Sequence, residues 1–446
     1  MDLVGLIPSF GGLIWTVLAF VSALSIIVAV HEYGHYIVGR WTGIHAEVFS
    51  LGFGPILYSR VDRRGTRWQV AALPFGGFVK FLGDADAASG KDAAAIAGLS
   101  PREKRNTMHG APLWARASTV AAGPVFNFIL SIAVFAGFFM VNGIATDAPV
   151  IGMQKPVPFE GQSLLPGDRI LKLNGQDTPD LASLVQVAGD LPPAQSAEYL
   201  LLRDGVEITQ TGPYPFPPVA DGVQAQSAAI AAGMLAGDVV LSVDGRAIYA
   251  FDELREAVGA SDGKPLLLKV WRPGGETFEA ALVPRRMDMP TPEGGFETRW
   301  LIGLSGGLLF VPETRTPGPF EAIGDGASQT WVIVKTSLSG LWHMITGAIS
   351  SCNLQGPIGI AETSGAAASQ GLASFIWFIA MLSTAVGLMN LFPVPILDGG
   401  HLVFHAYEAV SGRPPSDRAL RVLMGSGLAM LLALMVFALT NDLFCP

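Results

Sequence analysis

The stretch from Leu13 to Arg40 reads LIWTVLAFVSALSIIVAVHEYGHYIVGR, and it is the part of the sequence that decides the fold. No Asp, Glu, Lys or Arg stands between Leu3 and Val30, and a helix of that length crosses about 30 Å of hydrocarbon. The His-Glu pair that follows offers no small-residue cleavage site, so the stretch does not resemble a signal peptide. The sequence therefore predicts a retained membrane helix from about Leu13 to about Arg40.

The composition of the whole chain also indicates a membrane protein. Half of the 446 residues are hydrophobic and only 15% are charged, whereas soluble domains carry about 25% charged residues. The net charge of −9 argues against nucleic acid as a partner, because nucleic-acid-binding proteins present a basic surface. Two cysteines are too few for a disulfide framework or a cysteine zinc ribbon. We therefore expect a membrane protein with a soluble insert.

Three further stretches contain no charged residue and are long enough to cross a membrane: Ala117–Thr146, Thr363–Leu397 and Val422–Thr440. Between the second and third spans lies a long, mostly polar region. Together with the first stretch, these segments predict four transmembrane helices.

The distribution of Lys and Arg around the four stretches predicts their orientation. Residues 40–116 contain 11 basic and 6 acidic residues, and the connection between the third and fourth stretches adds three arginines. Both connections should be cytoplasmic, which puts the termini and the insert in the periplasm if the chain lies in a bacterial inner membrane. The insert, residues 147–320, contains 13 basic and 22 acidic residues and so accounts for the whole net charge.

The insert contains an internal repeat. LPGDRILKLNGQ at Leu165–Gln176 matches LAGDVVLSVDGR at Leu235–Arg246, and each copy has a Gly-Asp turn, an alternating strand and a hairpin turn signal. The two modules resemble PDZ domains of bacterial envelope proteases, and the second matches better through SAAIAAGMLAGD at Ser227–Asp238. PDZ domains add a peptide as a strand to a sheet edge. The modules therefore bind peptides or, alternatively, act as spacers that exclude bulky proteins.

Two smaller elements accompany the predicted spans. From Ala46 to about Leu82, alternating residues predict strands separated by Gly52–Pro55 and Pro74–Gly77. This sheet can dip into the membrane on the cytoplasmic side, provided that protein or a water-filled cavity covers its backbone. Residues 318–349 carry apolar side chains at helical spacing, which predicts an amphipathic helix on the outer membrane surface or packed on the insert.

These patterns define the expected fold class, a polytopic α-helical membrane protein with four transmembrane helices, a membrane-associated β element and two inserted PDZ-like α+β domains. The expected segments are 1–40 with the first transmembrane helix, 41–116 with the β element, 117–146 with the second helix, 147–220 and 221–312 with the PDZ-like domains, 313–362 with the amphipathic helix and connector, 363–400 with the third helix, and 401–446 with the fourth helix and the C-terminus.

A candidate catalytic motif, His31-Glu32-Tyr33-Gly34-His35, stands at the inner end of the first span. Residues four apart on a helix share a face, so both imidazoles can bind one metal ion while Glu32 lies beside them. Zinc at such a pair lowers the pKa of water to about 7, and the carboxylate can take the proton. Ionisable side chains are costly in a membrane and indicate a functional site, although pairing with another helix is a structural alternative.

Zinc needs a third protein ligand, and Asp398 is the clearest candidate. It lies in NLFPVPILDGG, residues 390–400, on the cytoplasmic side and at about the depth of the His pair. Pro393 and Pro395 remove helix hydrogen bonds and should unwind the span. The unwound backbone and Asn390 can then face the metal or an extended substrate. An Asp at a helix end is otherwise most often a cap, which is the alternative.

With these two motifs in this order, the chain resembles the site-2 proteases, a family of intramembrane zinc metalloproteases. Four spans with tandem PDZ modules between the second and third resemble the regulator of sigma-E protease branch of that family. The resemblance implies Zn²⁺ as the cofactor, with His31, His35 and Asp398 as its ligands. It implies Glu32 as the general base that takes the proton from the attacking water.

The resemblance also bears on the substrate. It implies a single-span membrane protein, either an anti-sigma factor already trimmed on the outer side or a remnant signal peptide. Periplasmic peptides or proteins are the expected ligands of the PDZ modules, and membrane lipid surrounds the spans. Segments 123–127 and 356–360 also resemble family segments, without an assigned catalytic role. The expected substrate-binding residues are Asn390, Pro393 and Pro395 of the unwound segment and Gly52, Phe53 and Gly54 on an edge strand.

Three other interpretations remain at this point. In a membrane gluzincin, Glu321 would be the third zinc ligand, although it belongs to the outer side. In a non-catalytic membrane scaffold or zinc-handling protein, the PDZ modules would hold partners and Glu32 would have no task. His401 and His405 form a second pair four residues apart, but position 402 is Leu, so this pair lacks a carboxylate that could activate water.

Overall fold

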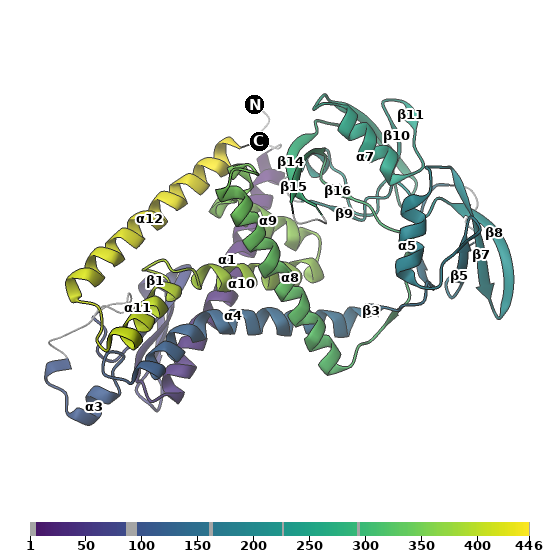
Figure 1. The fold of residues 1–446 in the computed structure, drawn as a ribbon. Helices are drawn as coiled ribbons and strands as arrows, with labels where there is room; N and C mark the ends of the chain where they lie inside the picture. Colours follow the sequence, from purple (N-terminus) through teal and green to yellow (C-terminus); the bar gives the residue numbers. More distant parts are fainter. Residues whose placement is uncertain (1–5, 86–95, 160–163, 225–226, 292–294, 446) are drawn as a thin grey trace. The chain divides into compact units, whose positions relative to one another are not determined.

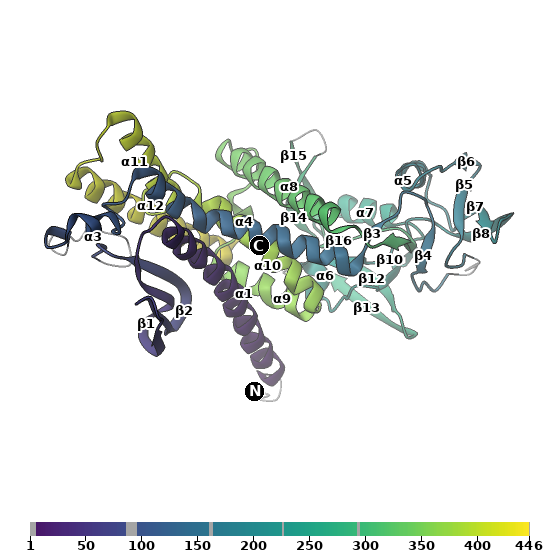
Figure 2. The ribbon, with the colours of Figure 1, turned by 90° about the horizontal axis from the view of Figure 1, so that it is seen from below.

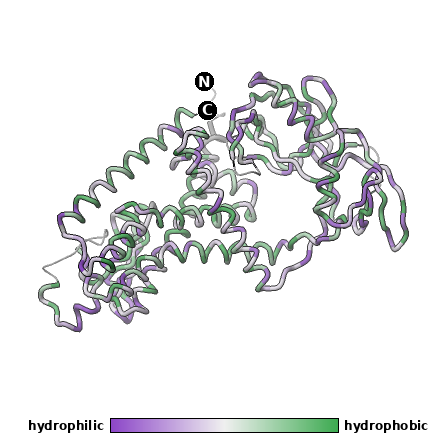
Figure 3. The backbone as a smooth tube through the Cα atoms, viewed as in Figure 1, coloured by the Kyte–Doolittle hydropathy of each residue, from purple (hydrophilic) through white to green (hydrophobic). Residues whose placement is uncertain are grey.

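Four helices of the protein are long and apolar enough to cross a membrane. The computed structural model describes residues 6–85, 96–159, 164–224, 227–291 and 295–445 (Figure 1). The four helices, green along much of their length in Figure 3, are α1 (Leu6–Trp41), α4 (Leu113–Asn142), α10 (Leu372–Asn390) and α12 (Asp417–Phe444). This confirms the four predicted membrane helices, whereas residues 3–5 of the first charge-free stretch lie outside the described residues.

The third charge-free stretch is not one helix, so the prediction of a single span over Thr363–Leu397 is wrong. Its first part belongs to α9 (Pro357–Ser369), and α10 begins only at Leu372. Gly371 interrupts the helix because its backbone has a φ of +111°. A lack of charge shows that a segment is apolar, but it does not show that its backbone is continuous.

The backbone after α10 is irregular, as the prolines predict. Helix α10 ends at Asn390, and α11 (Asp398–Ser411) begins after a non-helical segment that contains Pro393 and Pro395. Asp398 is the first residue of α11 rather than its cap, which is Leu397. The carboxylate of Asp398 is therefore available for contacts outside its own helix.

Two long strands, β1 (Ala46–Val61) and β2 (Arg67–Phe81), form the predicted β element. The prediction that Gly52–Pro55 and Pro74–Gly77 separate strands is wrong, since both segments lie inside strands. Gly52 and Gly54 have φ values of +88° and +84°, so the strand bends at bulges without ending.

The bend lets β1 pair with β2 on both of its edges. Residues 48–51 pair with 67–70 on one side and with 77–80 on the other, while residues 56–61 pair with 67–71. The hairpin is therefore a small layer with the strand order 56–61, 67–71, 48–51, 77–80. Phe49, Val79 and Phe81 share a buried cluster with Tyr36 of α1, which fixes the layer against this helix.

The insert contains the predicted repeat as two similar four-stranded sheets. The first has the order β6-β5-β7-β8 and the second the order β11-β10-β12-β13. The elements of the first sheet and its helix are β5 (Arg169–Leu173), β6 (Gln176–Asp177), α5 (Leu181–Asp190), β7 (Ser196–Arg203) and β8 (Val206–Pro213). Their counterparts are β10 (Val239–Val243), β11 (Arg246–Ala247), α7 (Phe251–Ala260), β12 (Leu266–Arg272) and β13 (Glu276–Leu282), preceded by α6 (Ala228–Ala231).

Short strands at the start of the insert and between its halves pair with strands at its end, and the earlier the first strand, the later its partner. β9 (Gly222–Val223) pairs with β16 (Leu304–Ser305), and β4 (Ile151–Gln154) pairs with β17 (Phe310–Pro312). β3 (Ile144–Ala145) pairs with β18 (Thr314–Arg315), and β14 (Arg285–Pro290) forms a hairpin with β15 (Phe296–Leu301). The first half is thus completed by residues after the second half, and its core includes Leu309 and Phe310. The expected boundaries 147–220 and 221–312 do not capture this closing strand.

The predicted amphipathic helix is α8 (Pro319–Ile345), and its position relative to a membrane stays a prediction. Figure 2 shows α8 beside α4, where Gly326 allows close packing, since an added Cβ would lie 2.6 Å from the carbonyl oxygen of Ile132. In the chain between the hairpin and α4, the short helix α3 (Pro101–Arg105) begins with a capping box formed by Ser100 and Glu103. A short 3₁₀ helix, η1 (Ser351–Asn353), precedes α9.

Segment 356–360 joins α9 to the fourth span. The carboxylate of Asp442, on α12, accepts hydrogen bonds from the backbone N–H groups of Gly356, Ile358 and Gly359 at 2.8, 3.0 and 3.2 Å. A carboxylate at this place favours the positive end of the α9 dipole. The two glycines are needed because a Cβ on either would come within 3 Å of α12 atoms.

One ion pair recurs in both halves of the insert. Asp168 binds Arg203, and Asp238 binds Arg272, each through two nitrogen–oxygen contacts of 2.6–2.7 Å. Both aspartate side chains are only 1% exposed. In the first pair, the Leu165 N–H also donates to Asp168 at 2.8 Å. The Gly-Asp turn of each repeat is thus tied to the last residue of β7 or of β12.

At neutral pH, Asp168→Asn should lower the free energy of unfolding of the insert by about 2 kcal/mol, because hydrogen bonds to a charged group are lost. Burial raises the pKa of Asp168, but hydrogen bonds from Arg203 and Leu165 outweigh it and hold the pKa below its usual value. The ionised carboxylate therefore stabilises the fold above the pKa of an unfolded aspartate, and this stabilisation is lost as the pH falls through the lower, folded pKa. Thermal unfolding of the full-length protein at several pH values measures both effects.

Asp177 provides the matched control, since its side chain is 77% exposed. Asp177→Asn should change stability by less than about 0.5 kcal/mol. A penalty for Asp168→Asn that persisted in acid, below the folded pKa, would contradict this account.

Candidate active site

Helix α1 presents His31 and His35 on one face, and their Nε2 atoms lie 3.1 Å apart. Oδ2 of Asp398 lies 3.2 Å from Nε2 of His31 and 3.5 Å from Nε2 of His35. Among the residues that the structure describes, these three form the one cluster of His, Cys, Asp and Glu side chains able to hold a metal ion. The start of α11 and the C-terminal part of α1 therefore meet at this cluster.

The spacing of the three atoms fits a zinc ion. Tetrahedral zinc with bonds of about 2.0–2.1 Å holds its ligand atoms about 3.3–3.4 Å apart. The observed separations of 3.1, 3.2 and 3.5 Å bracket this value. Oδ2 of Asp398 is also buried without a hydrogen-bond partner, which is costly unless a cation satisfies it. The donor set and its geometry thus suit zinc with a fourth position left open.

Groups on α4 orient both imidazole rings. Nδ1 of His35 lies 2.8 Å from the carbonyl oxygen of Thr119, and Nδ1 of His31 lies 3.2 Å from Nδ2 of Asn127, whose Oδ1 is buried without a partner. When Nε2 of His31 binds a metal, its Nδ1 carries the ring proton and needs an acceptor. A half-turn of the Asn127 amide presents Oδ1 to that proton and gives both atoms a partner.

Glycines bring α1 and α4 close enough for these contacts. An added Cβ on Gly123 would lie 2.2 Å from Nε2 of His35, and one on Gly34 would lie 2.5 Å from the carbonyl oxygen of Ala122. Any side chain at Gly123 would therefore occupy the position of the His35 ring. Segment 123–127 thus shapes the site through the space at Gly123 and the amide of Asn127.

Glu32 lies between α1 and the last part of β2. An added Cβ on Gly77 would lie 3.1 Å from Cγ of Glu32, and the backbone of Val79 hydrogen-bonds the Glu32 carboxylate. The side chain is partly buried and one residue from His31. This position beside the metal-ligand cluster suits a proton acceptor.

The expected substrate-binding residues are less close together. The side-chain amide of Asn390 donates to the carbonyl oxygen of Val386 in its own helix, at 2.9 Å. Pro393 is exposed, whereas Pro395 packs against the position of Gly427 on α12. Gly52, Phe53 and Gly54 occupy the bent part of β1, where Phe53 stacks on Phe78 at a centroid distance of 6.0 Å. Their role in substrate binding stays a prediction.

His401 and His405 lie on α11, outside the metal-ligand cluster. Burial, aided by the nearby Arg116 guanidinium, lowers the pKa of His405 to about 4, so this ring is neutral at physiological pH. Arg116 itself forms a bidentate pair with Glu408 at 2.6 and 3.0 Å. Glu321, the alternative third ligand, is exposed in the first turn of α8 and does not belong to the cluster.

Comparison with known proteins decides the family. The model of peptidase family M50 matches residues 19–434, which is nearly the whole chain. The chain belongs to peptidase family M50. This is the family of the site-2 proteases, so the chain is an intramembrane zinc metalloprotease, and the resemblance seen in its motifs is confirmed.

Individual relatives agree with this assignment. The M50 peptidase is 37% identical over 433 residues to a protein of Rhizobium meliloti that is named as a zinc metalloprotease, covering 96% of each chain. It is 34% identical to the regulator of sigma-E protease RseP of Salmonella typhimurium and 32% identical to that of Escherichia coli, in each case over 461 residues that cover 96% of this chain and 98% of the relative. Membership of a peptidase family speaks against the non-catalytic scaffold.

Sequence reasoning from the motifs does not identify Thr119 and Asn127 as orienting groups. Thr119 acts through its backbone carbonyl, so its side chain carries no signal. Asn127 does carry one, because a fully buried amide in an otherwise apolar span needs a polar partner. Which partner it meets depends on how α4 packs against α1.

Asn127→Leu should weaken zinc binding by about 10- to 100-fold, because the His31 ring loses the acceptor that fixes its orientation. Asn127→Asp keeps an acceptor and should retain most of the affinity. Competition with a chelator, followed by metal analysis of the detergent-solubilised M50 peptidase, measures the effect.

Thr119→Val is the matched control, since it removes the hydroxyl and keeps the carbonyl that His35 uses. Equal zinc affinities for Asn127→Leu and Thr119→Val would show that the Asn127 amide does not orient the ring.

Proposed function

We propose that this M50 peptidase hydrolyses a peptide bond within or near the transmembrane segment of a single-span membrane protein in the bacterial inner membrane. A pre-trimmed anti-sigma factor or a remnant signal peptide is the substrate we infer. The names of the RseP relatives support a place in sigma-E regulation for those proteins. The full-length coverage of these relatives supports the same substrate class for this chain.

The cluster of His31, His35 and Asp398 carries the proposal. Three ligand atoms at zinc spacing, with a carboxylate on the adjacent residue, support metal-assisted hydrolysis. The two histidines of the cluster sit on a helix that is apolar enough to span a membrane, which supports a substrate that is also in the membrane. Positively charged connections on one side support the proposed topology, with the active site toward the cytoplasm and the termini and insert in the periplasm.

In this proposal, each residue has a defined task. His31, His35 and Asp398 would hold zinc, which would supply a Lewis acid for the scissile carbonyl and for the attacking water. The Glu32 carboxylate takes a proton from the attacking water and delivers it to the leaving amine nitrogen. Thr119 and Asn127 keep the imidazole rings in the orientation that exposes Nε2 to the metal.

The substrate must be extended where it is cut, because the coil of a helix shields its peptide bonds. Unpaired backbone groups are costly in lipid, and an edge strand of the hairpin can pair with them. We infer this role for the bent segment around Gly52, Phe53 and Gly54. The irregular backbone around Pro393 and Pro395, together with Asn390, would border the other side of the extended segment.

Glu32→Gln should abolish cleavage of a tagged single-span substrate, a loss of at least about 100-fold, because the amide cannot accept the proton from water. Zinc should stay bound, since the three ligands are unchanged. The assay compares wild type and variant in detergent, each with and without a zinc chelator, and metal analysis is run in parallel. Turnover that survived in Glu32→Gln would refute the proposed role.

The third ligand is tested in the same assay. Asp398→Asn should lose both zinc and cleavage, whereas Glu321→Gln, the matched change on α8, should keep both. The opposite pattern would favour the gluzincin alternative.

We further propose that the two halves of the insert are PDZ-like domains and that the second binds peptides. A groove with a volume of about 410 Å³ lies between α7 and β15, and Leu254, Val258 and Trp300 contribute to its lining. A helix facing a short strand is the arrangement in which an extended peptide can add to a sheet edge. Occupied or not, the insert would also restrict access for untrimmed substrates.

Trp300→Ala should weaken binding of peptides with apolar C-termini by about 10-fold or more, because buried aromatic anchors dominate such contacts. Fluorescence anisotropy with the full chain in detergent and a panel of labelled peptides measures this. Val283→Ala is the control, because Val283 is exposed and does not line the groove. If no peptide binds the wild type, the spacer alternative holds.

A further inference from the structure

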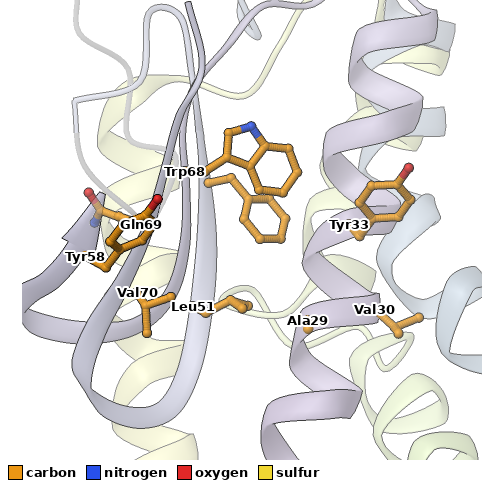
Figure 4. Close-up of a pocket in the computed structure, with 9 residues that line it drawn as sticks. Ala29, Val30, Tyr33, Leu51, Tyr58, Trp68, Gln69 and Val70 are labelled. Carbon is orange, nitrogen blue, oxygen red and sulfur yellow. The ribbon is translucent and has the colours of Figure 1, made fainter. Parts of the chain in front are cut away.

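An apolar cavity of about 390 Å³ lies between α1 and the β1–β2 hairpin. Figure 4 shows α1 on one side and the hairpin on the other. Ala29, Val30 and Tyr33 contribute to the helix side, while Leu51 and Val70 contribute to the hairpin side. No step of the proposed mechanism uses this cavity.

The hairpin side of the cavity continues to the catalytic motif. Tyr58, Val70, Leu51 and Gly77 follow one another across the strands in a single row. Side chains in one such row point to the same face of a sheet. Gly77 ends the row without a side chain, and a Cβ added there would lie 3.1 Å from Cγ of Glu32.

The distances along this row are short. Neighbouring strands lie about 4.8 Å apart, so Leu51 is a single strand away from the position that touches Glu32. On the helix side, Ala29 and Glu32 are three residues apart and therefore neighbours on the helix surface. A group bound in the cavity is consequently within one side-chain length of the proposed base.

We propose that this cavity receives a bulky apolar side chain of the substrate, adjacent to the scissile bond, and that Ala29, Leu51 and Val70 set the size it accepts. The inference rests on the proposed function and adds a specificity site to it. An apolar cavity of about 150 Å³ suffices for benzene, so the present volume accepts a Leu or Phe side chain. Transmembrane substrates supply such side chains in every turn.

The small side chain of Ala29 leaves room in the cavity. The cavity ends where Gly77 packs against α1, since an added Cβ there would lie 3.0 Å from Cγ1 of Val28 and 3.1 Å from Cγ of Glu32. A substrate residue anchored here would hold its own backbone against the hairpin, next to the Glu32 carboxylate. Because α1 is apolar enough to span a membrane, a lipid acyl chain is the competing occupant. If a lipid occupied the cavity, the enzyme would show no preference for the size of the substrate side chain. The two occupants can therefore be told apart by measuring that preference.

The test measures kcat/KM for single-span substrates that carry Ala, Val, Leu, Phe or Trp at each position flanking the cleavage site. Wild type should prefer Leu or Phe over Ala by about 10-fold or more at one flanking position, the range expected for filling an apolar pocket. Ala29→Phe, which fills the cavity, should remove this preference and leave the Ala substrate best. Val70→Ala, which enlarges it, should shift the preference toward Trp.

Leu57→Phe is the matched control, because Leu57 is exposed on the same hairpin and does not line the cavity. It should keep the wild-type preference. If Ala29→Phe cuts nothing, Val70→Ala decides alone, with its melting temperature and zinc content showing that it is folded. An unchanged preference in Val70→Ala overturns the inference.

The dependence of cleavage on zinc and Glu32 tests the proposed function, whereas the size preference at a flanking position tests the specificity site alone. If wild type cleaves in a zinc- and Glu32-dependent manner but no position shows a size preference, only the specificity site is wrong and a lipid becomes the favoured occupant. If wild type and Glu32→Gln behave alike on every substrate, the proposed function itself is wrong.

Discussion

Three polar atoms of partly buried side chains have to be held within 3.5 Å of one another among largely apolar helices. Uncompensated, two imidazoles and a carboxylate in such a place would destabilise the fold, whereas a shared zinc ion satisfies all three. The packing around the site serves to hold these three atoms together. Gly34 and Gly123 let α1 and α4 approach, so that Thr119 and Asn127 reach the outer nitrogens of the rings.

The same demand explains why regular structure is interrupted around the site. Asp398 reaches the histidines because α10 ends at Asn390 and a new helix begins after the prolines. Similarly, the hairpin bends at Gly52 and Gly54, which brings the end of β2 beside Glu32. Irregular backbone at membrane depth is tolerated where protein covers it or water reaches it. A protease needs both an open metal position and access for an extended chain, and unbroken helices would provide neither.

Much of this organisation could be predicted from the sequence because the signals are local. Charge-free stretches report four membrane helices, and the spacing of His31 and His35 reports one helix face with a carboxylate beside it. The repeat at Leu165 and Leu235 reports two similar β-rich halves, which the paired Asp168–Arg203 and Asp238–Arg272 contacts reproduce atom by atom. Asp398 could be proposed as the third ligand only because its expected depth in the membrane equals that of the two histidines on another span.

The sequence by itself therefore determined the class of protein, the metal-binding motif and the repeated insert. Each of these is indicated by periodicity, charge or residue spacing within a short stretch of the chain. Only the tertiary structure decided which partners meet across helices and strands. It broke the third span at Gly371, paired β1 with β2 on both edges, and closed the first half of the insert with β17. It also set Asn127 against His31 and formed a cavity between α1 and the β1–β2 hairpin. These contacts join residues far apart in the chain, and packing alone selects them.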